Sequence, residues 1–170
     1  MSMHHEWLAL VEISGPFLAI PVLKEAFPQG LEELDAAKRK RLRQAYDEWR
    51  EAQETDDPRL EDLHTAWIDE VLSHGLELDE DGRGDVLKRK DWCANHLTVA
   101  PPEHGVSLSP DFAVVGNGDA PLMLVHAYAP DIDLDATRKL DGWASTPAER
   151  MVTLCRATGC RLGLVTNGER

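Results

Sequence analysis

Hydrophobic residues recur at helical spacing in two parts of the first half of the chain. Between residues 31 and 54, apolar residues alternate with Glu, Lys and Arg, and neither Gly nor Pro interrupts the run. This pattern predicts a long amphipathic helix. From residue 60 to 74, the apolar residues follow an i, i+3, i+4, i+7 stripe, and we expect Gly75 to cap this second helix. His64 lies on the apolar stripe, so we expect it to be a core histidine.

The second half of the chain favours strands. Short apolar runs between turn signals predict strands at residues 92–100, 111–115, 122–128 and 161–166. Asn117-Gly118 between the two middle runs is a hairpin signal. Before the last run, Thr146, Pro147 and Glu149 supply an N-cap, a first-turn proline and a capping-box carboxylate for a helix through residue 158. A second turn signal, Asn167-Gly168, calls for another strand, so we expect the domain to be truncated at its C-terminal end, in front of a longer protein.

Charge and composition narrow the class of protein. The net charge is −13, no apolar run approaches the length of a bilayer-spanning helix, and the N-terminus lacks the regions of a signal peptide. We therefore expect a soluble, cytoplasmic protein that has no contact with a membrane. The cysteines Cys93, Cys155 and Cys160 have no Cys-x-x-Cys spacing, which predicts reduced packing residues. A strongly acidic chain is also a poor autonomous DNA binder.

The predicted order of elements from residue 56 onward is α-β-β-β-α-β. With Pro110-Asp111 opening one strand of the hairpin, this order resembles the PD-(D/E)xK restriction-endonuclease core. The resemblance implies an α/β fold: an endonuclease-like domain at residues 56–170 with an N-terminal helical extension at residues 1–55. In such a site, strand acids and a helix glutamate bind a divalent cation, and a lysine supports the attack on the phosphate.

The resemblance assigns degenerate nuclease positions to four residues. Asp111 is the strand aspartate and Glu70 lies where the helix glutamate belongs, but His126 and Tyr128 replace the second acid and the lysine. One interpretation is a scaffold whose site has lost its chemistry, without metal or confident catalytic residues. The alternative is a modified site, in which His126 binds a transition metal and another base replaces the lysine.

Most of the chain also resembles the N-terminal region of large S-adenosylmethionine-dependent adenine-N6 DNA methyltransferases of the type IIG restriction-modification and DISARM anti-phage kind. The motifs that carry this resemblance are His5-Glu6-Trp7-Leu8, Ser14 to Leu18, Phe27 to Leu31, Pro110-Asp111-Phe112 and Leu164 to Gly168. The resemblance implies that the parent protein binds S-adenosylmethionine and double-stranded DNA, with a defence-system subunit as a possible partner.

No cofactor-binding residue is assigned to this segment. A glycine-containing cofactor loop after a strand and an Asn/Asp-Pro-Pro-aromatic element for a flipped adenine do not occur in the sequence. We therefore expect a segment that docks DNA or a protein partner and is not itself catalytic. The alternatives are an active Mg/Mn-dependent endonuclease domain and an interaction module unrelated to DNA.

Two basic clusters are candidates for contacts with DNA phosphates. They are Lys38, Arg39, Lys40, Arg41 and Arg43 within the long helix, and Lys88, Arg89 and Lys90 before Trp92. The competing interpretation is a solvated helix face, on which these cations pair with nearby Asp and Glu side chains.

Overall fold

The structure is a computed structural model that describes residues 8–9, 19–31 and 33–170. The chain divides into two compact units, residues 1–36 and residues 37–170. Of the N-terminal sequence motifs, residues 5–7 and 14–18 lie outside the described residues. Within the first unit, Ile20–Ala26 form the short helix α1. The second unit includes the long helix from Ala37 onward.

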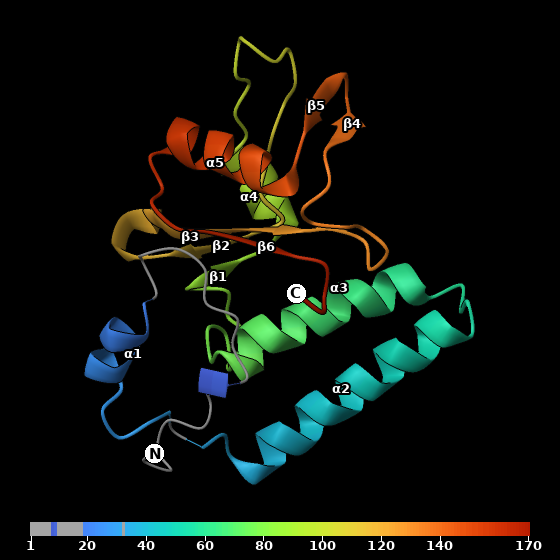
Figure 1. Ribbon diagram of the computed structural model, residues 1–170, viewed down its shortest axis with the longest axis vertical. Helices are drawn as coiled ribbons and strands as arrows, with labels where there is room; N and C mark the ends of the chain where they lie inside the picture. Colours follow the sequence, from blue (N-terminus) through green and yellow to red (C-terminus); the bar gives the residue numbers. More distant parts are fainter. Residues whose placement is uncertain (1–7, 10–18, 32) are drawn as a thin grey trace. The chain divides into compact units, whose positions relative to one another are not determined.

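The second unit is a mixed α/β structure (Figure 1). Its elements are α2 (Ala36–Glu54), α3 (Leu60–Glu70), the π-helical turn η2 (Val71–Gly75), β1 (Leu87–Lys88), α4 (Lys90–His96), β2 (Phe112–Val115), the 3-10 turn η3 (Asn117–Asp119), β3 (Pro121–Ala127), β4 (Arg138–Leu140), β5 (Trp143–Ser145), α5 (Pro147–Thr158) and β6 (Gly163–Thr166).

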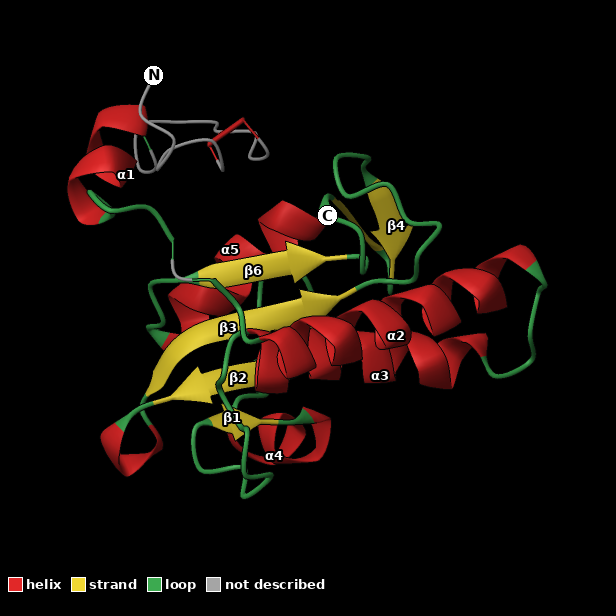
Figure 2. Cartoon of the chain, turned by 90° about the horizontal axis from the view of Figure 1, so that it is seen from below, coloured by secondary structure: helices red, strands yellow, loops and turns green. Residues whose placement is uncertain are grey.

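Four of the strands form one mixed sheet in the order β1-β2-β3-β6. The β1-β2 and β2-β3 pairs are antiparallel, with Phe112 opposite Val125, whereas β3 and β6 are parallel, with Val125 opposite Leu164. Figure 2 shows β6 at one edge of this sheet and β1 at the other. The predicted hairpin is thus confirmed, and Gly118 adopts the left-handed φ of 68° that its turn requires.

Each face of the sheet packs against helices. On one face, Ala113 and Leu124 pack with Cys93 of α4 and Leu154 of α5. On the other face, a second cluster joins the sheet to α3; its members are Ile68, Leu72, Leu87, Phe112, Val114 and Val125. Because side chains alternate along a strand, successive residues of β2 and β3 enter the two clusters in turn.

The helix α2 packs on α3 through aromatic rings. Trp49 is fully buried and stacks on Trp67 with 5.9 Å between ring centroids, and Tyr46 meets Trp67 edge-on at 5.4 Å. The same cluster holds the turn after β6, because the Trp67 Nε1–H donates to the Gly168 carbonyl at 2.8 Å. A Cβ at Gly168, where φ is +91°, would lie 2.8 Å from Trp49, so this turn has room only for glycine.

The prediction of a strand at residues 92–100 is wrong. Residues 90–96 form α4, in which Trp92 and His96 lie one helical turn apart and stack with 4.4 Å between ring centroids. Of the predicted strand, only Val99 pairs, in a single bridge to Leu108. The strand that precedes the hairpin in the sheet is the two-residue β1, which the apolar pattern does not indicate.

The predicted helices are confirmed with shifted ends. The long helix begins at Ala36 instead of residue 31. The second continues beyond Glu70 as the π-helical turn, and Leu76, not Gly75, is its C-cap. The helix α5 has the predicted capping box. The Glu149 N–H donates to Thr146 Oγ1 at 3.2 Å, and the Thr146 N–H donates to Glu149 Oε2 at 2.7 Å.

Among the described helices, none combines the length and the apolar character needed to cross a membrane.

Candidate functional site

The start of β2 and the end of β3 meet at Asp111. The Asp111 N–H donates to the Val125 carbonyl at 2.9 Å, and Asp111 Oδ2 accepts from the Ala127 N–H at 2.9 Å. Because Phe112 is opposite Val125, Asp111 lies beside the last residues of β3. The structure therefore brings Asp111 together with the segment that carries His126 and Tyr128, although one oxygen of the Asp111 carboxylate is already engaged by the backbone.

Asp111 and Tyr128 line one pocket of about 530 Å³ between α3 and the strand ends. The remaining lining residues come from α3, the start of α4, the ends of β2 and β3 and the segment after β3: Leu60, Glu61, His64, Thr65, Ile68, Lys90, Phe112, Ala127, Ala129, Pro130 and Asp131. Its ionisable groups are thus three carboxylates, one lysine, one histidine and one phenol. This mixture suits a polar ligand that carries both donors and acceptors.

His126 does not line this pocket. Its Nε2 donates to the Ser109 carbonyl at 2.8 Å, and its ring meets that of Tyr128 edge-on with 5.7 Å between centroids. The other ring nitrogen, Nδ1, is buried without a hydrogen-bond partner among the described residues. In the described part of the chain, no three His, Cys, Asp or Glu side chains are placed to hold a metal ion together. His126 therefore acts in this structure as a brace between β3 and the segment before β2.

Burial raises the pKa of the Tyr128 hydroxyl, and the charge of Asp111 raises it further while that of Arg150 opposes the change. A phenol with a raised pKa stays protonated near neutral pH, so it donates hydrogen bonds and does not act as a base. Burial also raises the pKa of the Cys93 thiol to about 11, again with a contribution from Asp111. Cys93 is consequently a packing residue without thiolate character.

Glu70 lies apart from Asp111. Arg41 Nη2 donates to Glu70 Oε2 at 2.9 Å, and His74 Nδ1 lies 3.4 Å from the same oxygen. Glu70 lines a different pocket from that of Asp111, together with Asp69, Asp79 and Arg89 among others. The structure thus does not bring the proposed helix glutamate to the strand aspartate.

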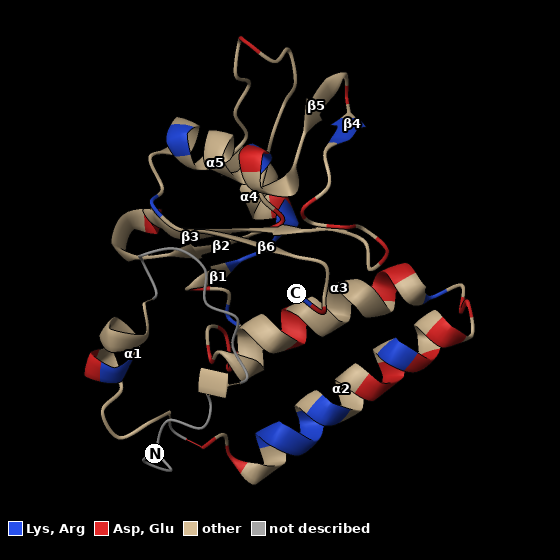
Figure 3. Cartoon of the chain, in the orientation of Figure 1, with Lys and Arg blue, Asp and Glu red and all other residues tan. Residues whose placement is uncertain are grey.

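Most of the candidate DNA-contact residues pair with acids within the chain. Lys38 pairs with Glu77 and Glu80, Arg41 with Glu70, Arg43 with Asp47, Lys88 with Asp119, and Arg89 with Asp69 and Asp79. Figure 3 shows most cations of α2 in the first half of the helix and its acids in the second half. Arg39, Lys40 and Lys90 have no ion pair with a described residue. The interpretation of a solvated, paired helix face thus describes most of both clusters.

Three residues of the Asp111 pocket were not identified as site residues from the sequence: Glu61, His64 and Asp131. His64 was expected in the core, and it is buried with Nε2 donating to the Tyr128 carbonyl at 2.7 Å. Lys90 was assigned to a phosphate-binding cluster and not to the Asp111 pocket, because nothing in the local pattern places the start of α4 beside Asp111.

Comparisons of the chain with protein families, with curated proteins and with solved structures returned no match.

Proposed function

We propose that the chain is a non-catalytic docking domain of a DNA adenine-N6 methyltransferase in a restriction or anti-phage defence system. Its fold supports a nuclease-like origin. Across the main sheet, the order of elements is α3, β1, β2, β3, α5 and β6, which is the α-β-β-β-α-β order of the PD-(D/E)xK core, with α4 and the β4-β5 hairpin as insertions. Asp111 stands at the start of the second strand, as that resemblance requires.

The observation that carries the proposal is the state of the Asp111 site. The strands hold Asp111 beside His126 and Tyr128, but His126 is hydrogen-bonded to Ser109, Tyr128 is a protonated phenol, and Glu70 pairs with Arg41. A divalent cation needs several oxygen ligands, and the positions that supplied them in a nuclease are occupied by groups with structural roles. In this proposal, the chain keeps the backbone arrangement of the nuclease core without its ligand set.

The parent protein supplies the remaining functions in this proposal. S-adenosylmethionine binds outside these residues, and double-stranded DNA is held by the whole enzyme, because this chain carries a net charge of −13 and most of its candidate cations are paired. The role of the chain is to dock the methyltransferase core, a partner subunit or the DNA that they hold.

The proposal is tested with the protein that contains this chain. We expect DNA methylation with S-adenosylmethionine and no cleavage of plasmid in Mg²⁺ or Mn²⁺, with both results unchanged by Asp111→Ala. Cleavage that Asp111→Ala abolishes would overturn the proposal. A second variant, His126→Glu combined with Tyr128→Lys, restores the second acid and the lysine and asks whether those two side chains alone were lost.

One observation favours the alternative of an active Mg/Mn-dependent endonuclease. Lys90 lines the same pocket as Asp111, and so do the carboxylates of Glu61 and Asp131. A lysine from α4 would then take the role of the one missing at Tyr128. This alternative predicts metal-dependent plasmid cleavage that both Lys90→Ala and Asp111→Ala abolish, whereas Lys40→Ala, in α2, leaves it unchanged.

A further inference from the structure

The strand β6 has an open edge. On one side it pairs with β3, where the Leu124 N–H donates to the Leu162 carbonyl at 3.0 Å and the Tyr128 N–H donates to the Thr166 carbonyl at 2.8 Å. A parallel ladder uses alternate residues of a strand, so the N–H and C=O groups of Gly163 and Val165 point away from β3. Among the described strands, β3 is the sole partner of β6.

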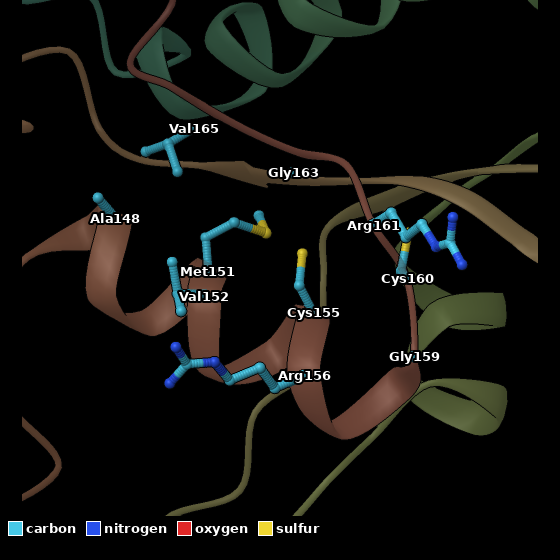
Figure 4. A pocket seen from close by; sticks show the side chains of 10 residues that line it. All are labelled: Ala148, Met151, Val152, Cys155, Arg156, Gly159, Cys160, Arg161, Gly163 and Val165. Atoms are coloured by element: carbon cyan, nitrogen blue, oxygen red, sulfur yellow. The ribbon is translucent and has the colours of Figure 1, made fainter. Parts of the chain in front are cut away.

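A groove of about 550 Å³ runs along this edge, between α5 and β6. Figure 4 shows Met151 and Cys155 reaching from α5 toward the strand at Gly163. A Cβ at Gly163 would lie 2.7 Å from Met151 Sδ and 3.1 Å from Cys155 Sγ, so the glycine lets the helix approach the strand closely. On the other face of β6, Leu162 is 49% exposed and Leu164 is 37% exposed. Both faces of the open edge are therefore apolar.

The charge along the groove is opposite to that of the chain. None of its 10 lining residues is acidic, although the chain has 31 acids. Arg156 and Arg161 line it, and both are exposed without an ion pair to a described residue. Most other cations of the second unit are paired, so two unpaired arginines beside an unpaired strand give the groove a preference for acidic partners.

We propose that this edge binds an extended, acidic segment of a protein partner, which adds to the sheet as a strand beside β6. The backbone of the segment pairs with Gly163 and Val165. One of its apolar side chains enters the groove over Met151 and Cys155, and the next covers Leu162 and Leu164, because side chains alternate between the faces of a sheet. Glu or Asp residues that flank the apolar run face Arg156 and Arg161.

Binding at this groove would give the proposed docking role a definite surface, and the inference rests on that role. Its residues lie on the strand edge, whereas the Asp111 pocket lies between α3 and the strand ends, and the two share no lining residue. The test below measures peptide binding alone, so its failure is distinguishable from a failure of the plasmid and methylation assays.

The first experiment probes the backbone pairing. A fluorescein-labelled peptide with a run of Val and Ile between Glu residues is titrated with the protein to about 1 mM, and binding is followed by fluorescence anisotropy. We expect saturable binding that is lost when alternate amides of the peptide are N-methylated in the register that faces β6, and retained when the other register is methylated. Equal binding of both methylated peptides, or no binding of the unmodified one, would overturn the proposal.

The protein is then changed at the same edge. Val165→Pro removes an N–H that faces away from β3, so the ladder to β3 keeps its hydrogen bonds while the open edge loses a donor. We expect loss of peptide binding with an unchanged circular dichroism spectrum. If Val165→Pro instead abolishes a concentration-dependent dimer seen by sedimentation, and the peptide does not bind, the edge pairs with a second copy of the chain and the proposal is wrong.

Charge reversal tests the acidic preference. Arg156→Glu with Arg161→Glu should weaken binding of the Glu-flanked peptide about tenfold and strengthen binding of a Lys-flanked one, as two exposed charge pairs are exchanged for two repulsions. The matched control, Arg138→Glu with Lys139→Glu, makes the same charge change on β4, whose residues do not line the groove. An equal effect of the two double variants would show that only the net charge matters, and would overturn the proposal.

Discussion

At the scale of single residues, His64 links three parts of the second unit. Its Nε2 donates to the Tyr128 carbonyl, its ring lies 5.7 Å from that of Trp49, and Gly168 packs against its edge. With the ring hydrogen on Nε2, Nδ1 carries no hydrogen, and it is buried without a partner among the described residues. Protonation of Nδ1 would place an unpaired N–H and a charge in this position, so burial lowers the pKa of His64 from its ordinary value of 6.5.

This lowered pKa predicts a loss of stability in acid. The unfolded chain takes up a proton at His64 near pH 6.5, whereas the folded protein resists it until a lower pH. The stabilising difference is present above pH 6.5 and is lost as the pH falls through the window between the unfolded and folded values. Urea unfolding of His64→Gln should show a flatter decline between about pH 7 and pH 5 than the unmodified chain. An identical slope for His64→Gln and the unmodified protein would contradict the assignment.

The candidate site was only partly predictable at this scale. The resemblance to the endonuclease core assigned Asp111 and Tyr128 to one site, and the hairpin register does bring the ends of their strands together. Glu70 was placed at the site from its position on the preceding helix, but that position alone does not say where along the sheet the helix crosses. Lys90 and Asp131 belong to segments that reach the pocket only through tertiary packing, so no local pattern marks them.

At the scale of elements, the helices α2, α3 and α5 were predictable because each combines an apolar stripe with a breaker or a cap. The stretch from Trp92 to Ala100 was misassigned because a short apolar run fits a strand and a helix equally well. The hairpin of β4 and β5 was missed, although Asp141-Gly142 is a hairpin signal and both residues have positive φ. β1 has two residues and is defined by its pairing with β2, which sequence periodicity does not report.

The capping box of α5 supplies a prediction for one helix. Thr146→Ala removes the side-chain acceptor of the Glu149 N–H and should lower the free energy of unfolding by about 1 kcal/mol. Thr146→Ser keeps the hydroxyl and should stay within about 0.5 kcal/mol of the unmodified protein. Urea denaturation of the three proteins compares these values. A loss in the serine variant equal to that in the alanine variant would mean that the Thr146 methyl group, and not the cap, stabilises this end of the helix.

Arg89 forms ion pairs with both α3 and the loop after η2. Its substitution therefore tests whether its role is structural. Its guanidinium donates to Asp69 at 2.6 Å and to Asp79 at 2.8 Å, and the Asp79 side chain is 1% exposed. Burial alone would raise the pKa of Asp79, but hydrogen bonds from Arg89 and from the Gly84 N–H outweigh it, so this pKa lies below its usual range. Removal of Arg89 leaves the Asp79 carboxylate buried without its counter-charge.

We therefore expect Arg89→Ala to lower the free energy of unfolding by about 2 kcal/mol, less than for a fully buried pair because Arg89 itself is 42% exposed. The matched control Arg83→Ala breaks an exposed pair with Asp81 and should cost about 0.5 kcal/mol or less. Chemical denaturation measures both. If Arg89→Ala is as stable as Arg83→Ala, Arg89 is free to serve as a phosphate contact.

At the scale of the whole chain, net charge and ion pairing decide how it meets DNA. An acidic protein repels the phosphate backbone unless unpaired cations gather on one surface. Here most of the predicted contact residues are paired within the chain, and of the long-helix cluster only Arg39 and Lys40 are exposed without an ion pair to a described residue. These ion pairs join α2 to α3 and join both helices to residues 77–80, so the paired cations are not free to contact phosphates.

The isolated chain should accordingly not bind duplex DNA. A labelled duplex titrated with the chain at about 0.15 M salt should show no anisotropy change up to about 100 µM, the upper range of non-specific DNA affinities. Arg39→Glu with Lys40→Glu should leave this result unchanged, as should the control Arg138→Glu with Lys139→Glu. Micromolar binding that weakens steeply with salt, and that the first double variant abolishes while the control retains it, would contradict the prediction. Such a result would make α2 a DNA-binding surface of this chain, because two exposed cations would then outweigh the repulsion from a net charge of −13.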